Sequence, residues 1–299
     1  MTHPYMTGPR RRTLLAVGAG IALTAVTPSA RAAEPDGFAE AEPDAFGELE
    51  REYSARLGVF AYDTATGRTV THRADERFPM CSVFKAVAAG AILSEGVDLS
   101  RRIHYTQEDV TSSGYAPITS QHVGTGMTVE ELCSAAVSHS DNTAANLLLR
   151  RLGGPTAVTR LARGLGDRKT RLDRWEPDLN SAEPWRETDT TTPRAISGTL
   201  AKLVLGDALS PSGRALLTSW LVANSTNIDR FRAGFPAGWT LADKTGTGSY
   251  GTANDAGVVW PPGRPPLVVA VLSTKPIEQG PSENALVARA AGVVAGELA

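Results

Sequence analysis

Short apolar runs typical of β-strands lie near both ends of the chain. Residues 58–63 and 69–73 flank a short connection that contains Gly67, and this arrangement predicts a β-hairpin. The last third of the chain returns to the same pattern. We expect three further strands there, the third of them central because it is almost entirely apolar: residues 239–245, 255–260 and 267–272.

The middle of the chain has the apolar spacing of helices. Thr128 and Glu131 form a capping-box pattern at the start of one predicted helix. A polar segment over 167–192 interrupts this region, and a loop of that length inside a domain is usually functional. The expected helices are residues 46–57, 82–95, 128–136, 143–152, 157–165, 193–204 and 282–298.

Strands at both ends around a helical middle predict a two-domain α/β fold. We expect an antiparallel five-stranded sheet flanked by helices, built from residues 46–78 and 222–299. An all-α domain, residues 79–221, should be inserted between these two parts and include a functional loop around 171–190. Residues 33–45, rich in Ala, Glu, Pro and Asp, should form a loose N-terminus.

The first 32 residues are typical of an export signal. Arg10–Arg12 precede an apolar run over 14–26, and Ala30–Ala32 has a small-x-small cleavage pattern. The run is too short to span a bilayer, and the paired arginines resemble a twin-arginine signal. We therefore expect residues 1–32 to be cleaved and the mature protein to be secreted without a membrane anchor. An uncleaved anchor is the alternative.

Composition narrows the function classes. The 299 residues are 41% hydrophobic and 21% charged, as in an ordinary globular protein. Removing residues 1–32 deletes four arginines and no acidic residue, so the net charge of −2 becomes −6. No basic field is left to attract nucleic acid, and a monomer is the default. We predict that Cys81 and Cys133 are free thiols, because twin-arginine export moves proteins already folded in a reducing cytoplasm.

Ser82 and Lys85 are three residues apart at the start of a predicted helix. Residues at this spacing share one face, so the lysine should lie beside the serine hydroxyl. A lysine whose pKa is lowered by burial can take the proton that makes serine a nucleophile. The ordinary alternative is a capping serine followed by an exposed lysine.

Ser140–Asp141–Asn142 lies in a short link between two predicted helices. Its serine hydroxyl could carry a proton to a leaving nitrogen, and its amide could bind a substrate carbonyl or a lysine. Helix capping explains the same residues without catalysis. We expect Asp141 to be a cap in either case.

Lys244–Thr245–Gly246 ends a predicted strand. A cation and a hydroxyl on one side suit a substrate anion, and Gly246 lets a ligand lie close to the backbone. The N–H of Thr247 would then join that of Ser82 in stabilising negative charge on a substrate oxygen. The alternative is an ordinary hairpin corner.

Glu176 lies in the long polar segment, with Asn180 four residues later. Such a carboxylate and amide could hold one water between them for general-base chemistry. The ordinary alternative is an acidic residue on a surface loop. Two neighbours argue against it, because Trp175 should bury part of the loop and Pro177 could fix it through a cis peptide bond.

The two ends of this loop carry opposite charges. We expect Arg174 to pair with Asp189 and hold the ends together. Loss of the pair should loosen the loop and weaken any hydrolytic step that depends on it.

Together, S-x-x-K, S-D-N, E-x-x-L-N and K-T-G resemble in order and spacing the motifs of the class A serine β-lactamases. The resemblance covers roughly residues 45–298. It implies the same two-domain α/β fold, with the site in the cleft between the domains. It also implies hydrolysis of the β-lactam ring of penicillins and cephalosporins through an acyl-serine intermediate, and thus antibiotic resistance, with no metal and no cofactor.

The resemblance implies a role for each motif residue. Ser82 would be acylated, with Lys85 or Glu176 as the acylation base. Ser140 would pass a proton to the β-lactam nitrogen, and Glu176 with Asn180 would hold the deacylating water. Substrate contacts would come from Tyr115, Asn142, Lys244, Thr245, Gly246 and Thr247.

Two positions depart from the family's pattern. The strand after K-T-G lacks the carboxylate-binding arginine of many members, and Arg230 matches the position that other members use, with Arg232 as a surface residue. The family's cysteine partner for Cys133 is replaced by Ala89. Cys81 instead adjoins the nucleophile, which supports the prediction of free thiols.

Two other functions are the alternatives, and the first of them shares three of the four motifs. One is a penicillin-binding D,D-peptidase, and the other is a non-hydrolytic β-lactam sensor that stays acylated. Neither needs a deacylating water. Glu176 together with Asn180 therefore favours the hydrolase.

Overall fold

The computed structural model describes residues 44–299. The predicted signal segment, residues 1–32, lies outside the described residues, as does the predicted loose N-terminus up to residue 43. The described residues belong to one compact unit. The domain boundaries proposed above therefore stay a prediction.

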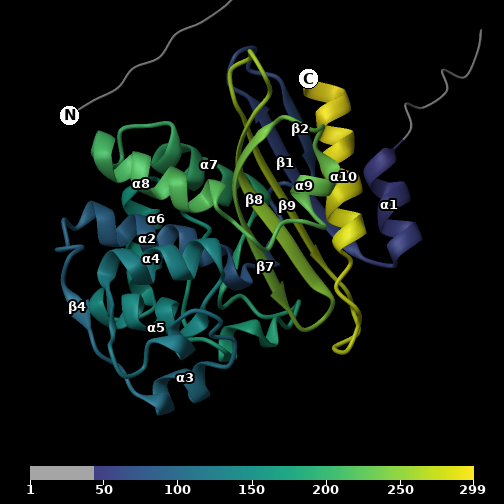
Figure 1. The fold of residues 1–299 in the computed structure, drawn as a ribbon. Helices are drawn as coiled ribbons and strands as arrows, with labels where there is room; N and C mark the ends of the chain where they lie inside the picture. Colours follow the sequence, from purple (N-terminus) through teal and green to yellow (C-terminus); the bar gives the residue numbers. More distant parts are fainter. Residues whose placement is uncertain (1–43) are drawn as a thin grey trace, which may run out of the picture. The chain divides into compact units, whose positions relative to one another are not determined.

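An antiparallel five-stranded sheet forms in the order β2-β1-β9-β8-β7 (Figure 1). It takes strands from both ends of the described chain, which confirms the predicted fold class. β9 is the middle strand and is buried along its whole length, as its apolar run predicts. β7, which carries K-T-G, lies at one edge. The strands are β1 Arg56–Asp63, β2 Thr69–His72, β7 Thr240–Gly248, β8 Thr252–Trp260 and β9 Leu267–Thr274.

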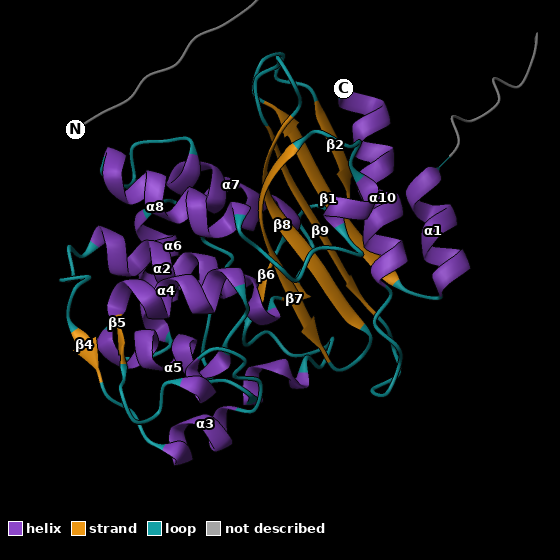
Figure 2. Cartoon of the chain, viewed as in Figure 1, coloured by secondary structure: helices purple, strands orange, loops and turns teal. Residues whose placement is uncertain are grey.

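Helices cover both faces of this sheet (Figure 2), and an apolar core lies on each face. Val59 and Val271 pack in one core with Leu286 of α10, and Val258 and Val268 pack in the other, which includes α7. Successive side chains of a strand point to opposite faces, so the same strands supply both cores. The helices beside the sheet are α1 Ala45–Tyr53, α7 Pro193–Val204, α9 Phe231–Gly234 and α10 Asn284–Leu298.

α2 lies at the centre of the helical part. Its residues from Phe84 to Ile92 are all buried, and it contacts α4, α5, α6, α7 and α8. A helix covered on every side needs no polar face, which explains its nearly uniform apolar sequence. The helices here are α2 Phe84–Ser94, α3 Gln107–Ser113, α4 Val129–Ser138, α5 Asn142–Arg151, α6 Thr156–Gly164 and α8 Pro211–Val222. The short elements are η1 Cys81–Val83, η2 Thr119–Gln121, η3 Asp178–Ser181, β3 Phe78–Pro79, β4 Arg102–Ile103, β5 Met127–Thr128 and β6 Thr190–Thr191.

The structure corrects three predicted boundaries. The first helix ends before Ser54, which adopts a left-handed conformation (φ 48°), and Leu57 belongs to β1 instead. The helix expected from residue 82 begins at Phe84 after the 3-10 turn η1, so Ser82 is not its cap. β7 continues to Gly248, and K-T-G therefore lies within a strand rather than at its end.

Apolar spacing alone does not predict α3 or α8. α8 follows Ser210, whose hydroxyl accepts a hydrogen bond from Gly213 N at 3.2 Å, and begins with Pro211. A capping serine followed by proline is a start signal that could have predicted this helix. α3 also has a capping box, from Thr106 and Asp109, but it is too short and polar to show a periodicity.

Two local predictions are confirmed. Thr128 and Glu131 form both hydrogen bonds of a capping box at the start of α4. Cys81 and Cys133 are free and buried. Burial raises the pKa of both thiols, and this keeps them protonated and unreactive in the folded protein.

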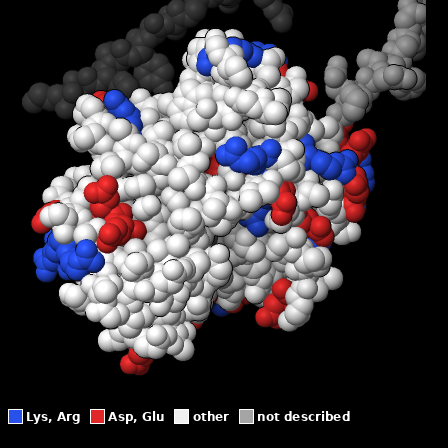
Figure 3. Space-filling model, in the orientation of Figure 1, with Lys and Arg blue, Asp and Glu red and all other residues white. Residues whose placement is uncertain are grey.

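Surface charge is mixed on the face shown in Figure 3. Lysine and arginine lie among aspartate and glutamate there, and most of the visible surface is neither. This face therefore offers no extended basic surface of the kind that binds nucleic acid. The absence of a nucleic-acid partner stays a prediction.

Candidate active site

Ser82 lies in η1, the tight turn that leads into α2, and is 7% exposed. The preceding Cys81 has φ 46°, a left-handed conformation that is uncommon outside glycine. The edge strand β7 passes close to this turn. A Cβ at Gly246 would lie 2.8 Å from Met80 O, so glycine at this position also allows the strand to approach the turn.

A cavity of about 290 Å³ opens beside Ser82 and collects residues from several motifs. Tyr115, 57% exposed, forms part of its wall. Lys85, Glu176, Lys244 and Arg230 are buried and do not line the cavity directly. The lining residues are Ser82, Tyr115, Ser140, Asn142, Asn180, Thr226, Thr245, Gly246 and Thr247.

Lys85 is fully buried one turn after Ser82, where the spacing of the motif predicts it. Its Nζ donates to Ser140 O at 2.7 Å and to Asn142 Oδ1 at 2.6 Å. It also lies 3.0 Å from Glu176 Oε1. Burial lowers the pKa of Lys85, while the charge of Glu176 opposes that shift. The alternative of an exposed surface lysine is wrong.

The Ser140–Asn142 link is held by its middle residue. Asp141 caps α5 by accepting from Ala144 N at 2.9 Å, which confirms its predicted role. It also accepts from the backbone and hydroxyl of Thr119 at 2.9 Å. These bonds fix the turn, in which Ser140 has a φ of 58°.

Glu176 faces the nucleophile. Ser82 Oγ donates to its Oε1 at 3.3 Å, and Asn180 Nδ2 donates to its Oε2. Its backbone is clamped by Asn146, whose amide accepts from Glu176 N at 3.0 Å and donates to Glu176 O at 2.9 Å. The carboxylate is therefore fixed through both its main chain and its side chain.

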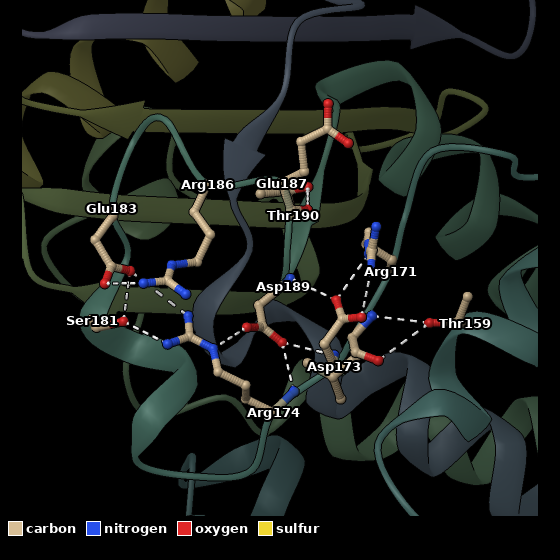
Figure 4. A network of polar contacts seen from close by, with 11 residues as sticks. Thr159, Arg171, Asp173, Arg174, Ser181, Glu183, Arg186, Glu187, Asp189 and Thr190 are labelled. Carbon is tan, nitrogen blue, oxygen red and sulfur yellow. Dashed lines mark hydrogen bonds and ion pairs between the residues drawn. The ribbon is translucent and has the colours of Figure 1, made fainter.

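Polar contacts hold the loop that carries Glu176 (Figure 4). Arg174 Nε donates to Asp189 Oδ2 at 2.6 Å, which confirms the predicted pair. Asp189 Oδ1 accepts from the backbone N–H groups of Asp173 at 2.8 Å and Arg174 at 2.9 Å. Arg174 also donates to Ser181 Oγ at 2.8 Å. One buried carboxylate thus gathers three donors from the opposite end of the loop.

Two further features of this loop were predicted, and one needs correction. The Glu176–Pro177 peptide bond is cis, as predicted. Trp175 is 38% exposed and so buries less of the loop than expected. The loop is held mainly by the polar contacts of Arg174 and Asp189, and less by burial of the tryptophan.

Lys244 and Lys85 converge on one hydroxyl. Lys244 Nζ donates to Ser140 Oγ at 3.1 Å, and Lys85 Nζ donates to the same oxygen at 3.5 Å. An ammonium can only donate, so while both lysines are charged Ser140 Oγ accepts from both and keeps its own proton free for a ligand. Burial, and next the positive charge of Lys85, lower the pKa of Lys244 to about 7.

Arg230 is 5% exposed and lies against the site end of β7. Its Nη1 donates to Gly246 O and to Asn254 O, both at 2.8 Å, and its Nη2 donates to Thr247 Oγ1 at 2.7 Å. Arg232 is exposed, as expected of a surface residue. The structure thus places Arg230, and not Arg232, directly behind Thr247 of the cavity wall.

No group of three or more His, Cys, Asp or Glu residues within 44–299 is arranged to hold a metal ion. The groups that converge on the cavity are hydroxyls, amides, two lysines, an arginine and one carboxylate. This set suits acyl transfer to serine, with bound charge on the substrate balanced by the cations.

Comparison with known proteins agrees with this chemistry. The model of a beta-lactamase enzyme family matches residues 44–298. The chain belongs to this family. A beta-lactamase of Streptomyces lavendulae is 56% identical over 298 residues, with 97% of each chain covered. The solved beta-lactamase from Streptomyces albus G is 60% identical with a TM-score of 0.84, covering 85% of this chain and 98% of that one.

The class A resemblance is confirmed as well. The last common ancestor of Gram-negative bacteria beta-lactamase class A is 52% identical, with a TM-score of 0.81 over 85% of this chain and 98% of that one. This beta-lactamase therefore has the fold and motif order that the sequence predicts.

Two residues of this beta-lactamase site are absent from the sequence-based prediction. Asn146, which clamps Glu176, lies within a predicted helix and carries no motif of its own. Thr226 lines the cavity and bonds to Thr245 Oγ1 from a link between two helices. Only a structure brings these positions together, because both act across long sequence separations.

We expect Asp189→Ala to loosen the loop. It removes the acceptor of three hydrogen bonds and leaves Arg174 without its partner, at a cost of about 2–4 kcal/mol of stability. Turnover of a β-lactam should fall at least about tenfold, because a shift of the base of about 1 Å is enough for such a loss. Steady-state kinetics and hydrogen exchange across residues 171–190 provide the measurement.

Asp178→Ala is the matched control, since Asp178 is an exposed carboxylate on the same loop. The control should keep the parent's kinetics. Unchanged turnover and unchanged exchange in Asp189→Ala would contradict the assigned role of the pair.

The lowered pKa of Lys244 predicts a pH dependence. Lysine is cationic below its pKa, so kcat/KM for an anionic β-lactam should fall as the pH rises through about 7. In Lys244→Arg this fall should vanish, because a guanidinium stays charged throughout. A pH profile of kcat/KM from about pH 6 to about pH 9 tests this. The same alkaline fall in both proteins would assign it to another group.

Proposed function

We propose that this beta-lactamase opens the β-lactam ring in two steps, acylation of Ser82 and then hydrolysis of the ester. The position of Glu176 carries this proposal. One oxygen of its carboxylate accepts from Ser82 Oγ and the other from the Asn180 amide. A base that lies between a nucleophile and an amide can activate both the serine and, later, a water.

In the first step, Ser82 Oγ bonds to the ring carbonyl carbon and gives up its proton. Glu176 accepts from Ser82 at 3.3 Å, and Lys85 lies 3.0 Å from the same carboxylate oxygen. The proton therefore has a path to either group. Burial favours the neutral form of Lys85, which is the form able to act as a base. Both assignments of the acylation base stay open.

The ring nitrogen needs a proton as its bond to the carbonyl breaks. Ser140 supplies it, because Lys85 and Lys244 in their ammonium forms can only donate to its hydroxyl, whose own proton is then free. The lysines also favour transient negative charge on that oxygen. Lys85 or Lys244 can then replace the lost proton.

Substrate contacts come from residues of the cavity wall, together with Lys244 behind it. Lys244, Thr245 and Thr247 take the substrate carboxylate, with Arg230 supporting Thr247, while Asn142 and Tyr115 contact the side chain of the drug. Arg230 donates to Thr247 Oγ1 at 2.7 Å, so the proton of that hydroxyl is free for the anion.

Negative charge develops on the carbonyl oxygen during both steps. The backbone N–H groups of Ser82 and Thr247 stabilise it, and such donors contribute about 3–4 kcal/mol each. β7 is an edge strand, so its outer side faces the turn of Ser82 and not another strand. Gly246 allows this approach.

In the second step, a water held by Glu176 and Asn180 attacks the ester. Asn180 Oδ1 is buried and has no hydrogen-bond partner within residues 44–299. It is thus an available acceptor beside the base. A peptidase or a sensor that stays acylated needs no such arrangement, and neither alternative is favoured.

The mass of the protein during turnover can distinguish the role of Ser82 from that of Glu176. Ser82→Ala should form no covalent adduct with benzylpenicillin, because the nucleophile is gone. Glu176→Ala should accumulate the acyl-enzyme, because its water is no longer activated, with kcat lower by about 100-fold or more. Intact mass spectrometry during turnover provides the measurement.

Glu187→Ala, an exposed carboxylate on the same loop, is the control and should turn over like the parent. Parent-rate turnover by Glu176→Ala would show that another group activates the water.

We also propose that the protein is exported and acts as a secreted monomer. The twin-arginine pattern at Arg10–Arg12 and the cleavage pattern at Ala30–Ala32 support export. None of the helices within residues 44–299 is long and apolar enough to cross a membrane. N-terminal sequencing of protein from the culture medium should start near residue 33, and sedimentation should give the mass of one chain. An intact N-terminus in the membrane fraction would overturn export.

A further inference from the structure

A chain of buried polar groups leads from Asp243 to the cavity. It passes through the link between α8 and α9, where Asn224 is 6% exposed, and ends at Thr226 and Thr245. Asp243 is fully buried. The directions of donation along this chain follow from its chemistry.

The Asn224 amide has one possible orientation. Its Nδ2 donates to the Asp243 carboxylate and to Asp243 O at 3.2 Å. Its Oδ1 accepts from Thr226 N at 3.0 Å, and a backbone N–H can only donate. Exchanging the two ends of the amide would place a donor against that N–H.

The Thr226 hydroxyl is then fixed as well. Thr226 Oγ1 lies 2.7 Å from Asn224 Oδ1, and the amide oxygen has no proton to give, so Thr226 donates. A hydroxyl has one proton. In the hydrogen bond between Thr226 and Thr245, the donor must therefore be Thr245. Thr245 thus gives its proton to Thr226 and offers only lone pairs to a ligand.

Two other hydroxyls at the cavity, those of Ser140 and Thr247, are in the opposite state. Ser140 accepts from Lys244 and Thr247 accepts from Arg230, so both keep a proton for the ligand. Thr245 is thus the hydroxyl that must reorient before it can donate to a substrate carboxylate. Reorientation breaks its bond to Thr226 unless Thr226 turns away from Asn224.

We propose that Thr226 is a positioning residue that lowers the affinity for the substrate carboxylate by holding the proton of Thr245. The proposal rests on the proposed function, in which Thr245 contacts that anion. Binding exchanges one hydrogen bond, from Thr245 to Thr226, for another, from Thr245 to the substrate. The binding free energy that Thr245 contributes is therefore reduced by the free energy of the hydrogen bond to Thr226 that is lost.

Thr226→Val removes the acceptor and keeps the shape of the side chain. The proton of Thr245 is then free for the substrate, so kcat/KM for benzylpenicillin should rise about 3–10-fold, the value of one hydrogen bond. The kcat should stay within about twofold, because deacylation does not involve this bond. Thr226→Ser keeps the hydroxyl and should restore the parent's kcat/KM.

The gain should require the hydroxyl of Thr245. In a Thr245→Val background, Thr226→Val should give no increase, and an equal increase there would overturn the proposal. A kcat/KM that is unchanged or lower in folded Thr226→Val would overturn it too. If Thr226→Val does not fold, Thr226→Ala is measured against the same criteria. Absence of turnover in the parent itself would refute the proposed function instead.

Discussion

The contact between Lys85 and Glu176 is the interaction on which the rest of the site depends. Their charged atoms lie 3.0 Å apart and both side chains are fully buried. A buried charge is costly unless it is paired and hydrogen-bonded, and Lys85 also bonds to Ser140 O and Asn142 Oδ1. The pair therefore ties together α2, the turn before α5 and the loop that holds Glu176. Each of these three segments supplies one motif. A shift of any of them would take from the buried charge of Lys85 one of the contacts that stabilise it.

Other buried charges surround this pair. Lys244 and Arg230 are buried on one side, and Asp243 and Asp255 lie behind them. Burial raises the pKa of Asp243 to about 6 and that of Asp255 well above its usual value, and it lowers the pKa of Lys244 to about 7. An apolar cluster would be easier to stabilise at this position. The buried cations nevertheless suit a site that binds an anion and passes protons among hydroxyls.

Sequence reasoning predicts most of this molecule for physical reasons. Short apolar runs predict the five strands, and the full burial of β9 follows from its almost entirely apolar sequence. Motif spacing predicts that Ser82 and Lys85 lie together, since a helical turn fixes their distance. It does not predict Asn146 or Thr226, whose hydrogen bonds join segments far apart in the sequence. The 3-10 turn at Ser82 is likewise missed, because apolar spacing does not distinguish it from the first turn of α2, which follows directly.

The central claim is that this network holds Glu176 where it can activate a water against an ester on Ser82. A crystal structure of the Glu176→Gln acyl-enzyme tests it most directly, because an amide cannot act as the base and the ester should persist. The account predicts an ordered water bonded to residue 176 and to the Asn180 side chain, on the loop side of the ester carbonyl. A dry position there, with the nearest water on the Ser140 side, would contradict it.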